Sequence, residues 1–221
     1  MELDILNGLN KAQCEAVQSV DGPVLIVAGP GSGKTRVITH RVAYLTRVCK
    51  VSPYSILAVT FTNKAASEMQ SRVLNLVPGS AGSLSVSTFH AFCSRLLHVE
   101  GDKIGLESFT IYDDTDQMEL IKQAIEDAEI DPKRFPKRAI QSAISKAKSL
   151  LIDSHEYSMR SANYFEQIVA RIYGRYENLL EKNHAVDFDD LLLRTVQLFR
   201  TVPSVLEKYQ ERFIHIMIDE F

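Results

Sequence analysis

The stretch AGPGSGKT, Ala28 to Thr35, restricts the possible folds of this chain more than any other part of its sequence. It matches the pattern GxxxxGK[ST] with alanine at the first position, and that pattern belongs between a strand and a helix. The apolar run PVLIVAG leads into the loop, and Val37, Arg41 and Leu45 follow it at helical spacing. Glycines let successive backbone N–H groups turn around an anion, and the helix N-terminus adds a positive dipole end. The stretch therefore predicts a phosphate-binding loop between a buried strand and a helix.

Two side chains of this loop are expected to add chemistry to that of the backbone. Lys34 is predicted to reach the β- and γ-phosphates of a nucleotide as a point charge. Thr35 is predicted to place its hydroxyl on Mg²⁺. The predicted nucleotide-binding residues of the loop are therefore Ala28, Gly29, Pro30, Gly31, Ser32, Gly33, Lys34 and Thr35.

The sequence ends in FIHIMIDEF, in which an apolar run leads into Asp219 and Glu220. In P-loop proteins a second strand ends beside the loop and presents an acid to Mg²⁺. Asp219 is therefore predicted to bind the metal, and Glu220 to take a proton from the attacking water. An acidic pair at a strand end is often only a solvated turn, but the glycine-rich loop upstream favours the functional interpretation. We also expect the natural protein to continue past Phe221, because the chain stops inside this site.

Composition and charge are ordinary for a globular protein, with 45% apolar residues, 24% charged residues and a formal charge of −3. This net charge does not indicate a polyanionic partner, although a local basic groove is compatible with it. The three distant cysteines, Cys14, Cys49 and Cys93, argue against a disulfide framework and a zinc site, and fit a cytoplasmic protein. No apolar stretch reaches the roughly 20 residues that cross a bilayer, so we expect no membrane partner.

Strand and helix patterns alternate in the first half of the chain. After PVLIVAG, the runs SILAVTF and SLSVSTF also read as buried strands, and a helical pattern follows each of them. Such alternation predicts parallel strands joined by crossover helices. The run FIHIMI near the end of the chain is predicted to return to the same sheet, which gives an α/β fold.

The pattern changes after about residue 112. From there to about residue 186 the chain is expected to be entirely helical, because apolar residues recur at helical spacing. Asp187 and Asp190 have the spacing of a capping box at the start of the next helix, which explains them better than a metal cluster does. We therefore predict an inserted, all-helical subdomain at 112–186 within a sheet domain formed by 1–111 and 187–221.

Several stretches resemble motifs of the UvrD/Rep/PcrA-type superfamily 1 helicases, and they occur in the order and at the spacing of that family. These are LNKAQCEAV (9–17) for the Q-motif, AGPGSGKTR (28–36) for motif I, AVTFTNKAASEM (58–69) for motif Ia, STFHAFCSRLL (87–97) for motif Ib, VDFDDLLL (186–193) for a segment before motif II, and IDEF (218–221) for motif II.

The resemblance implies the first RecA-like motor domain of an ATP-dependent 3′→5′ DNA helicase, with its helical insertion and a P-loop NTPase sheet. It implies ATP and Mg²⁺ as cofactors. By the same resemblance Gln13 reads the adenine edge, since an amide donates and accepts in one plane; the alternative is an ordinary surface glutamine. Arg36 is either near the nucleotide or a solvated arginine in the first helical turn.

A track for single-stranded DNA is also implied by the resemblance. Phe61 is expected to stack on a base or pack against it, with an ordinary core phenylalanine as the alternative. Thr62 and Asn63 are expected to bind phosphates, or only to cap a helix. Thr88 and His90 carry the same expectation of DNA contact, with a structural role as the alternative for His90.

The partners implied in this way are single-stranded DNA, junctions of single- and double-stranded DNA, a second RecA-like domain of the same chain, and repair or replication proteins. The second domain would supply arginines for the transferred phosphate, so the present chain alone is expected to hydrolyse little ATP. Two alternatives remain open. One is the helicase subunit of an AddA/RecB-type recombination nuclease, and the other is a P-loop nucleotide-binding module without motor activity.

Overall fold

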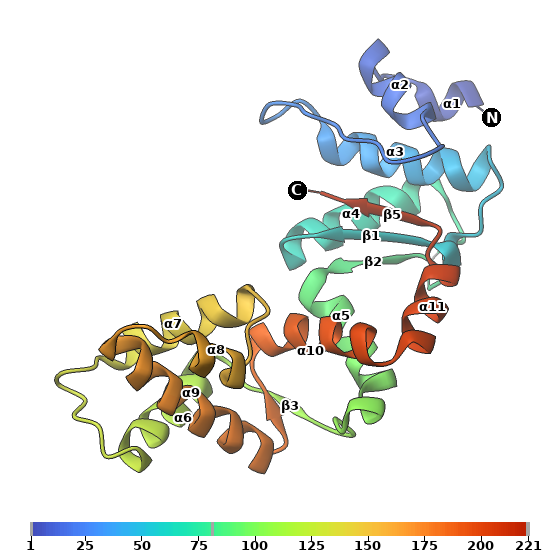
Figure 1. Ribbon diagram of the computed structural model, residues 1–221. Coiled ribbons are helices and arrows are strands. Elements are labelled where there is room, and N and C mark those ends of the chain that lie inside the picture. The colour runs from blue at the N-terminus through green and yellow to red at the C-terminus, as the bar shows by residue number, and fades with distance from the viewer. Residues whose placement is uncertain (1, 81, 220–221) are drawn as a thin grey trace. The chain divides into compact units, whose positions relative to one another are not determined.

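The chain folds into two compact units in the computed structural model, which describes residues 2–80 and 82–219 (Figure 1). The first unit comprises Met1–Phe92 and Leu206–Phe221, and the second comprises Cys93–Val205. This division falls at other residues than the expected boundaries near 111 and 187. One reason is that α10 (Phe188–Thr201) packs against α7 (Lys137–Ser149) and so forms part of the helical unit.

The first unit is built on a parallel sheet in the order β2–β1–β5 (Figure 1). Its strands are β1 (Ile56–Thr60), β2 (Ser85–Thr88) and β5 (His215–Ile218). The central strand β1 is buried along its whole length, as expected for a strand that is covered on both faces. Because the strands run parallel, their carboxyl ends meet at one edge of the sheet, where ligands bind in open α/β folds.

Helices cover both faces of β1 in the first unit. On one face, α3 (Lys34–Arg47) and α4 (Asn63–Leu76) contribute a cluster that contains Ile38, Val42, Met69 and Val73. The other face is covered by Phe89 and Phe92 of α5 (Phe89–Glu100), and by Phe213 and by Tyr209 of α11 (Pro203–Arg212). The remaining elements of this unit are α1 (Glu2–Leu6), α2 (Lys11–Gln18) and the short helix η1 (Pro53–Ser55).

The expected strand PVLIVAG is not formed, so that prediction was wrong. Residues 23–28 run without strand pairing, and Leu25 and Val27 are 76% and 89% exposed. A cavity of about 980 Å³ lies between this segment and β5. An apolar run indicates a preference for burial, but a strand also needs a neighbour whose backbone groups it can pair with. Among the described strands, β5 pairs with β1 and with no other strand.

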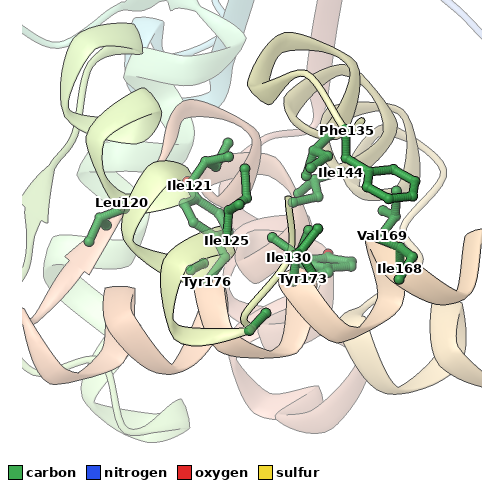
Figure 2. Packing of buried hydrophobic residues seen from close by; sticks show 14 of the residues in the cluster. Leu120, Ile121, Ile125, Ile130, Phe135, Ile144, Ile168, Val169, Tyr173 and Tyr176 are labelled. Atoms are coloured by element: carbon green, nitrogen blue, oxygen red, sulfur yellow. The ribbon is translucent and has the colours of Figure 1, made fainter. Parts of the chain in front are cut away.

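The second unit is a helical bundle around one apolar core. Besides α7 and α10 it contains α6 (Asp114–Asp127), α8 (Ser154–Arg160), α9 (Tyr164–Lys182) and the short helix η2 (Gly101–Ile104). Figure 2 shows Ile121 and Ile125 of α6 packed with Ile144 of α7 and Tyr176 of α9. These residues lie on the apolar faces that helical spacing predicted. Within residues 2–80 and 82–219, no helix has the length and apolar character needed to cross a membrane.

One part of the insertion is not helical. β3 (Thr110–Ile111) and β4 (Ala185–Val186) form a short parallel pair, so the expectation of an entirely helical segment up to residue 186 was wrong at its end. The chain enters and leaves the helical segment side by side there, and the two backbones satisfy each other's polar groups. The Tyr112 N–H extends the pairing by donating to the Val186 carbonyl at 2.9 Å.

A buried lysine is the main polar feature of the second unit. Lys148 of α7 is 1% exposed, and its Nζ lies 2.7 Å from Asp187 Oδ2, 2.8 Å from Asp190 Oδ1 and 2.8 Å from Glu177 Oε1. The Tyr176 hydroxyl also donates to Asp187 Oδ2 at 2.7 Å. Asp187 is at the same time the N-cap of α10 and forms a capping box with Asp190, as predicted. This lysine cluster connects three helices through one ammonium group.

Arg194 also contacts Glu177, at 3.2 Å, so Lys148 is left facing the two buried carboxyl groups of Asp187 and Asp190, and their pKa values differ. Burial and the charges of Glu177 and Asp187 raise the pKa of Asp190 to about 7, against the lowering effect of Lys148. Burial also opposes ionisation of Asp187, but Lys148 and the hydrogen bonds to the carboxylate lower its pKa below the ordinary value. Asp187 therefore carries a negative charge at neutral pH, whereas Asp190 is only partly ionised there.

We predict a pH dependence of stability from Asp190. A carboxyl whose pKa is raised on folding stabilises the fold below its unfolded pKa, and this contribution is lost as pH rises towards the folded pKa. The free energy of unfolding of the second unit should therefore fall, through this group, by up to about 1.4 kcal/mol per pH unit between its ordinary pKa of 3.8 and its folded pKa of about 7.

Asp190→Asn should remove this slope, because the amide keeps an acceptor for the Asp187 N–H and carries no titrating charge. Urea unfolding at several pH values across that window measures the effect. The half-buried neighbour Asp189, which does not contact Lys148 among the ion pairs of the cluster, gives the control Asp189→Asn, which should follow the wild type. Parallel curves for wild type and Asp190→Asn would contradict the assignment.

Candidate nucleotide and nucleic-acid site

The glycine-rich loop forms a tight turn in front of α3. Gly31 and Gly33 have φ values of 73° and 88°, in the left-handed region that favours glycine. The Ser32 hydroxyl donates to the Gly29 carbonyl at 2.7 Å, which closes the turn. α3 begins at Lys34, and no side chain caps its N-terminus. Its first N–H groups therefore remain available to an anion, which is the arrangement found in phosphate-binding helix N-termini.

Lys34 folds back over this loop. Its Nζ donates to the carbonyls of Ala28 and Gly29, each at 3.1 Å. Among the described residues, the ammonium group is thus held against the turn by neutral acceptors and by no carboxylate. A phosphate group entering the turn would offer it a stronger, charged acceptor.

Thr35 and Asp219 meet beside the loop. The Thr35 hydroxyl donates to Asp219 Oδ2 at 2.7 Å, which joins residues 184 positions apart in the sequence. Asp219 follows the last residue of β5, is 6% exposed, and donates its N–H to the Val59 carbonyl of β1 at 2.9 Å. Hydroxyl and carboxylate oxygens are ligands that Mg²⁺ accepts, with phosphate and water oxygens in its other positions. The donor set therefore fits a magnesium ion shared with a bound phosphate. Glu220 lies outside the described residues.

Gln13 and Arg36 lie behind the loop. The Gln13 amide group donates to the Ser32 carbonyl at 2.9 Å, and its oxygen accepts the Asn10 N–H at 3.0 Å. The Arg36 guanidinium lies against Gly8, where a Cβ atom would come within 2.8 Å of Nη2. Gln13 thus attaches α2 to the glycine-rich loop, and Arg36 packs the first turn of α3 against Gly8.

The expected DNA-contact residues follow β1 and β2. Phe61 comes directly after β1 and is 72% exposed, so it is not a core phenylalanine. Asn63 is the first residue of α4 and is also exposed. Thr62 is the N-cap of that helix, since its hydroxyl oxygen accepts the Ala65 N–H at 3.1 Å.

Thr88 and His90 take more internal positions. Thr88 is 6% exposed, and its hydroxyl oxygen accepts the Ala91 N–H at 3.2 Å, so it supports the start of α5. His90 is half-buried in the first turn of that helix. Among the five candidates, Phe61, Thr62 and Asn63 are exposed, whereas Thr88 is buried and His90 is half-buried.

Both groups of candidates lie at the same edge of the sheet. Phe61 follows β1, His90 follows β2, Asp219 follows β5, and all three strands are parallel members of the first unit. The nucleotide candidates and the DNA candidates therefore share the carboxyl edge, at which α/β proteins bind their ligands.

Two features of this region were missed from the sequence. Asn10 caps α2, and together with Gln13 it forms a capping box whose spacing is visible in LNKAQ. The contact from Gln13 to Ser32 has no such signal, because it joins residues 19 positions apart through a main-chain carbonyl.

Comparisons with known proteins agree with the resemblance noted from the motifs. A family model described as the UvrD/REP helicase N-terminal domain matches residues 9–221. The chain is 46% identical over 218 residues to the ATP-dependent DNA helicase PcrA of Bacillus subtilis (strain 168). Proteins of the same name from Staphylococcus aureus (strain Mu50 / ATCC 700699) and Staphylococcus epidermidis are 48% and 47% identical over the same length.

Each of these alignments covers 98% of the present chain and 30% of the relative. The chain thus spans about 30% of the length of the curated relatives it matches. The family model extends over nearly all of the sequence and includes the glycine-rich loop and Asp219. The chain belongs to the UvrD/REP helicase N-terminal domain family.

Proposed function

We propose that this chain is the ATP-binding N-terminal part of an ATP-dependent 3′→5′ DNA helicase that moves along single-stranded DNA in repair or replication. The observation that carries the proposal is the contact of Thr35 with Asp219 beside a glycine-rich loop, within a chain of this family. The relatives reported above are named as helicases, which favours this function over a nuclease subunit or a non-motor module.

For the nucleotide, the proposal assigns each part of the site a separate task. The N-terminus of α3 and Lys34 bind the β- and γ-phosphates. Thr35 and Asp219 hold Mg²⁺, which when bound neutralises charge on those phosphates. Glu220 accepts the proton of the attacking water. Gln13 contacts the adenine, and Arg36 lies beside the nucleotide, as the resemblance to the family implies.

For DNA, the proposal relies on the exposed end of β1. Phe61 offers an aromatic face to any base, which suits movement along a strand without sequence preference. Asn63, Thr62, Thr88 and His90 are assigned to the same track, where amide and hydroxyl groups suit phosphate contacts.

A backbone link joins the two halves of the site. The Asp219 N–H donates to the Val59 carbonyl, and Val59 is two residues before Phe61 on the same strand. A change in the position of Asp219 on nucleotide binding would therefore reach the DNA-contact residue through one hydrogen bond and one strand.

The complete protein is proposed to contain more than the two units described. A second RecA-like domain would close over the nucleotide and supply arginines, so the present chain alone should turn over ATP slowly. The motor part is proposed to consist of 1–111 and 187–221, with 112–186 as its insertion. We further propose that the complete protein acts at junctions of single- and double-stranded DNA, has repair or replication proteins as partners, and is located in the cytoplasm.

We predict that Lys34→Ala weakens binding of MgATP by roughly 10- to 100-fold, because a charged hydrogen-bond donor to the phosphates is lost. Isothermal titration calorimetry with and without Mg²⁺ measures this. Asp219→Asn should instead lose most of the Mg²⁺-dependent part of the affinity. Lys50→Ala, which removes an exposed lysine beyond the end of α3, is the control. Equal affinities for Lys34→Ala and Lys50→Ala would exclude the proposed phosphate site.

We predict that Phe61→Ala weakens binding of single-stranded DNA by roughly 5- to 100-fold, since it removes one stacking face. Fluorescence anisotropy with a labelled oligonucleotide measures the affinity, which should also fall as salt is raised. The control is Tyr54→Ala, because Tyr54 is 53% exposed but precedes β1 and lies at the opposite edge of the sheet. A DNA track elsewhere would be indicated if Tyr54→Ala had the larger effect.

A further inference from the structure

Gln13 uses both ends of its amide group on the protein itself. Its Oε1 accepts the Asn10 N–H at 3.0 Å, and its Nε2 donates to the Ser32 carbonyl at 2.9 Å. These partners fix the orientation of the amide, because the first is only a donor and the second only an acceptor. A glutamate would serve the capping box equally well, but it could not donate to a carbonyl. The residue type at this position thus matches the second contact and not only the first.

The Ser32 carbonyl is a sensitive point of the loop. In a trans peptide the carbonyl and the following N–H point in opposite directions. When Gln13 draws the Ser32 carbonyl towards α2, the Gly33 N–H is turned away from α2. That N–H belongs to the series of backbone donors at the start of α3 that can surround an anion. The amide of Gln13 therefore sets the direction of a phosphate-binding N–H from behind the loop.

Close packing shows that the contact is built into the fold. A Cβ atom at Gly33 would lie 3.0 Å from Gln13 Nε2, and Gly33 has a φ of 88°. Glycine is therefore needed there both for its backbone conformation and for the approach of the amide. In the opposite direction, Arg36 reaches back to Gly8, where a Cβ atom would meet Nη2 at 2.8 Å. The α1–α2 region therefore contacts the loop through Gln13 and the first turn of α3 through Arg36.

We infer that Gln13 is a positioning residue for the triphosphate, which orients the Ser32–Gly33 peptide for phosphate binding whether or not a base is present. This inference rests on the proposed function, and it adds a role that is separate from contact with adenine. The two roles are compatible, because the amide retains one N–H and one lone pair after its contacts with Ser32 and Asn10. Gln13 can then connect the base to the phosphate loop through a single side chain.

The test compares two ligands, MgATP and magnesium tripolyphosphate, which has the phosphate chain but no base. Gln13→Met keeps the length of the side chain and loses its hydrogen bonds. We expect it to weaken binding of both ligands by a similar factor, roughly 5- to 10-fold, as for the loss of one hydrogen bond in calorimetric titrations. Weaker binding of MgATP alone would overturn the inference, because Gln13 would then act only on the base.

A second variant separates positioning of the loop from stability of α2. Asn10→Ala removes the side chain that caps α2 and leaves the Gln13 donor in place. We expect it to bind tripolyphosphate as the wild type does, while Gln13→Met does not. Equal losses in the two variants would overturn the inference in favour of a general effect of α2. If wild-type protein bound neither ligand, the proposed nucleotide site itself would fail, which is a different outcome from either of these.

Discussion

The hydrogen bond between Thr35 and Asp219 is the constraint on which the rest of the site depends. It joins the start of α3 to the end of β5, and β5 is held in turn by its pairing with β1. The site is therefore complete only when the last strand has docked on the sheet. Any ligand that binds both residues would stabilise this docking by mass action. Binding of such a ligand and folding of the first unit would in this way be one linked process.

Much of this arrangement could be predicted because the relevant signals are local. The loop before Lys34 requires glycine at positions with left-handed φ, and the helix after it shows apolar spacing. Asp187 and Asp190 are three residues apart, which is the spacing of a capping box at a helix start, and the structure contains that capping box. Asp219 is a partial exception. Its proximity to Thr35 was inferred from the known plan of P-loop proteins and not from any local pattern.

The failures have a common physical cause, since they concern partners that are distant in sequence. The segment 23–28 is apolar, but its pattern does not say which strand would pair with it. Lys148 lies four residues after Ile144, on the buried face of α7. From helical spacing alone, a lysine near the end of that face would be expected to reach solvent. Its burial depends on Glu177, Asp187 and Asp190, which arrive from two other helices. When several helices each contribute one polar group to a core, no periodic pattern in the sequence indicates that these groups will meet.

The open side of β5 has a further consequence. β5 is an edge strand in the described sheet, and Ile216 is 59% exposed on the same face as the buried Leu57. Leu25 and Val27 lie unpaired across the adjoining cavity. An uncovered edge next to apolar side chains can act as a template for strands of other molecules. We therefore expect intermolecular β-sheet growth from this edge at high protein concentration, which mild chaotropes or a charged solubility partner would counteract.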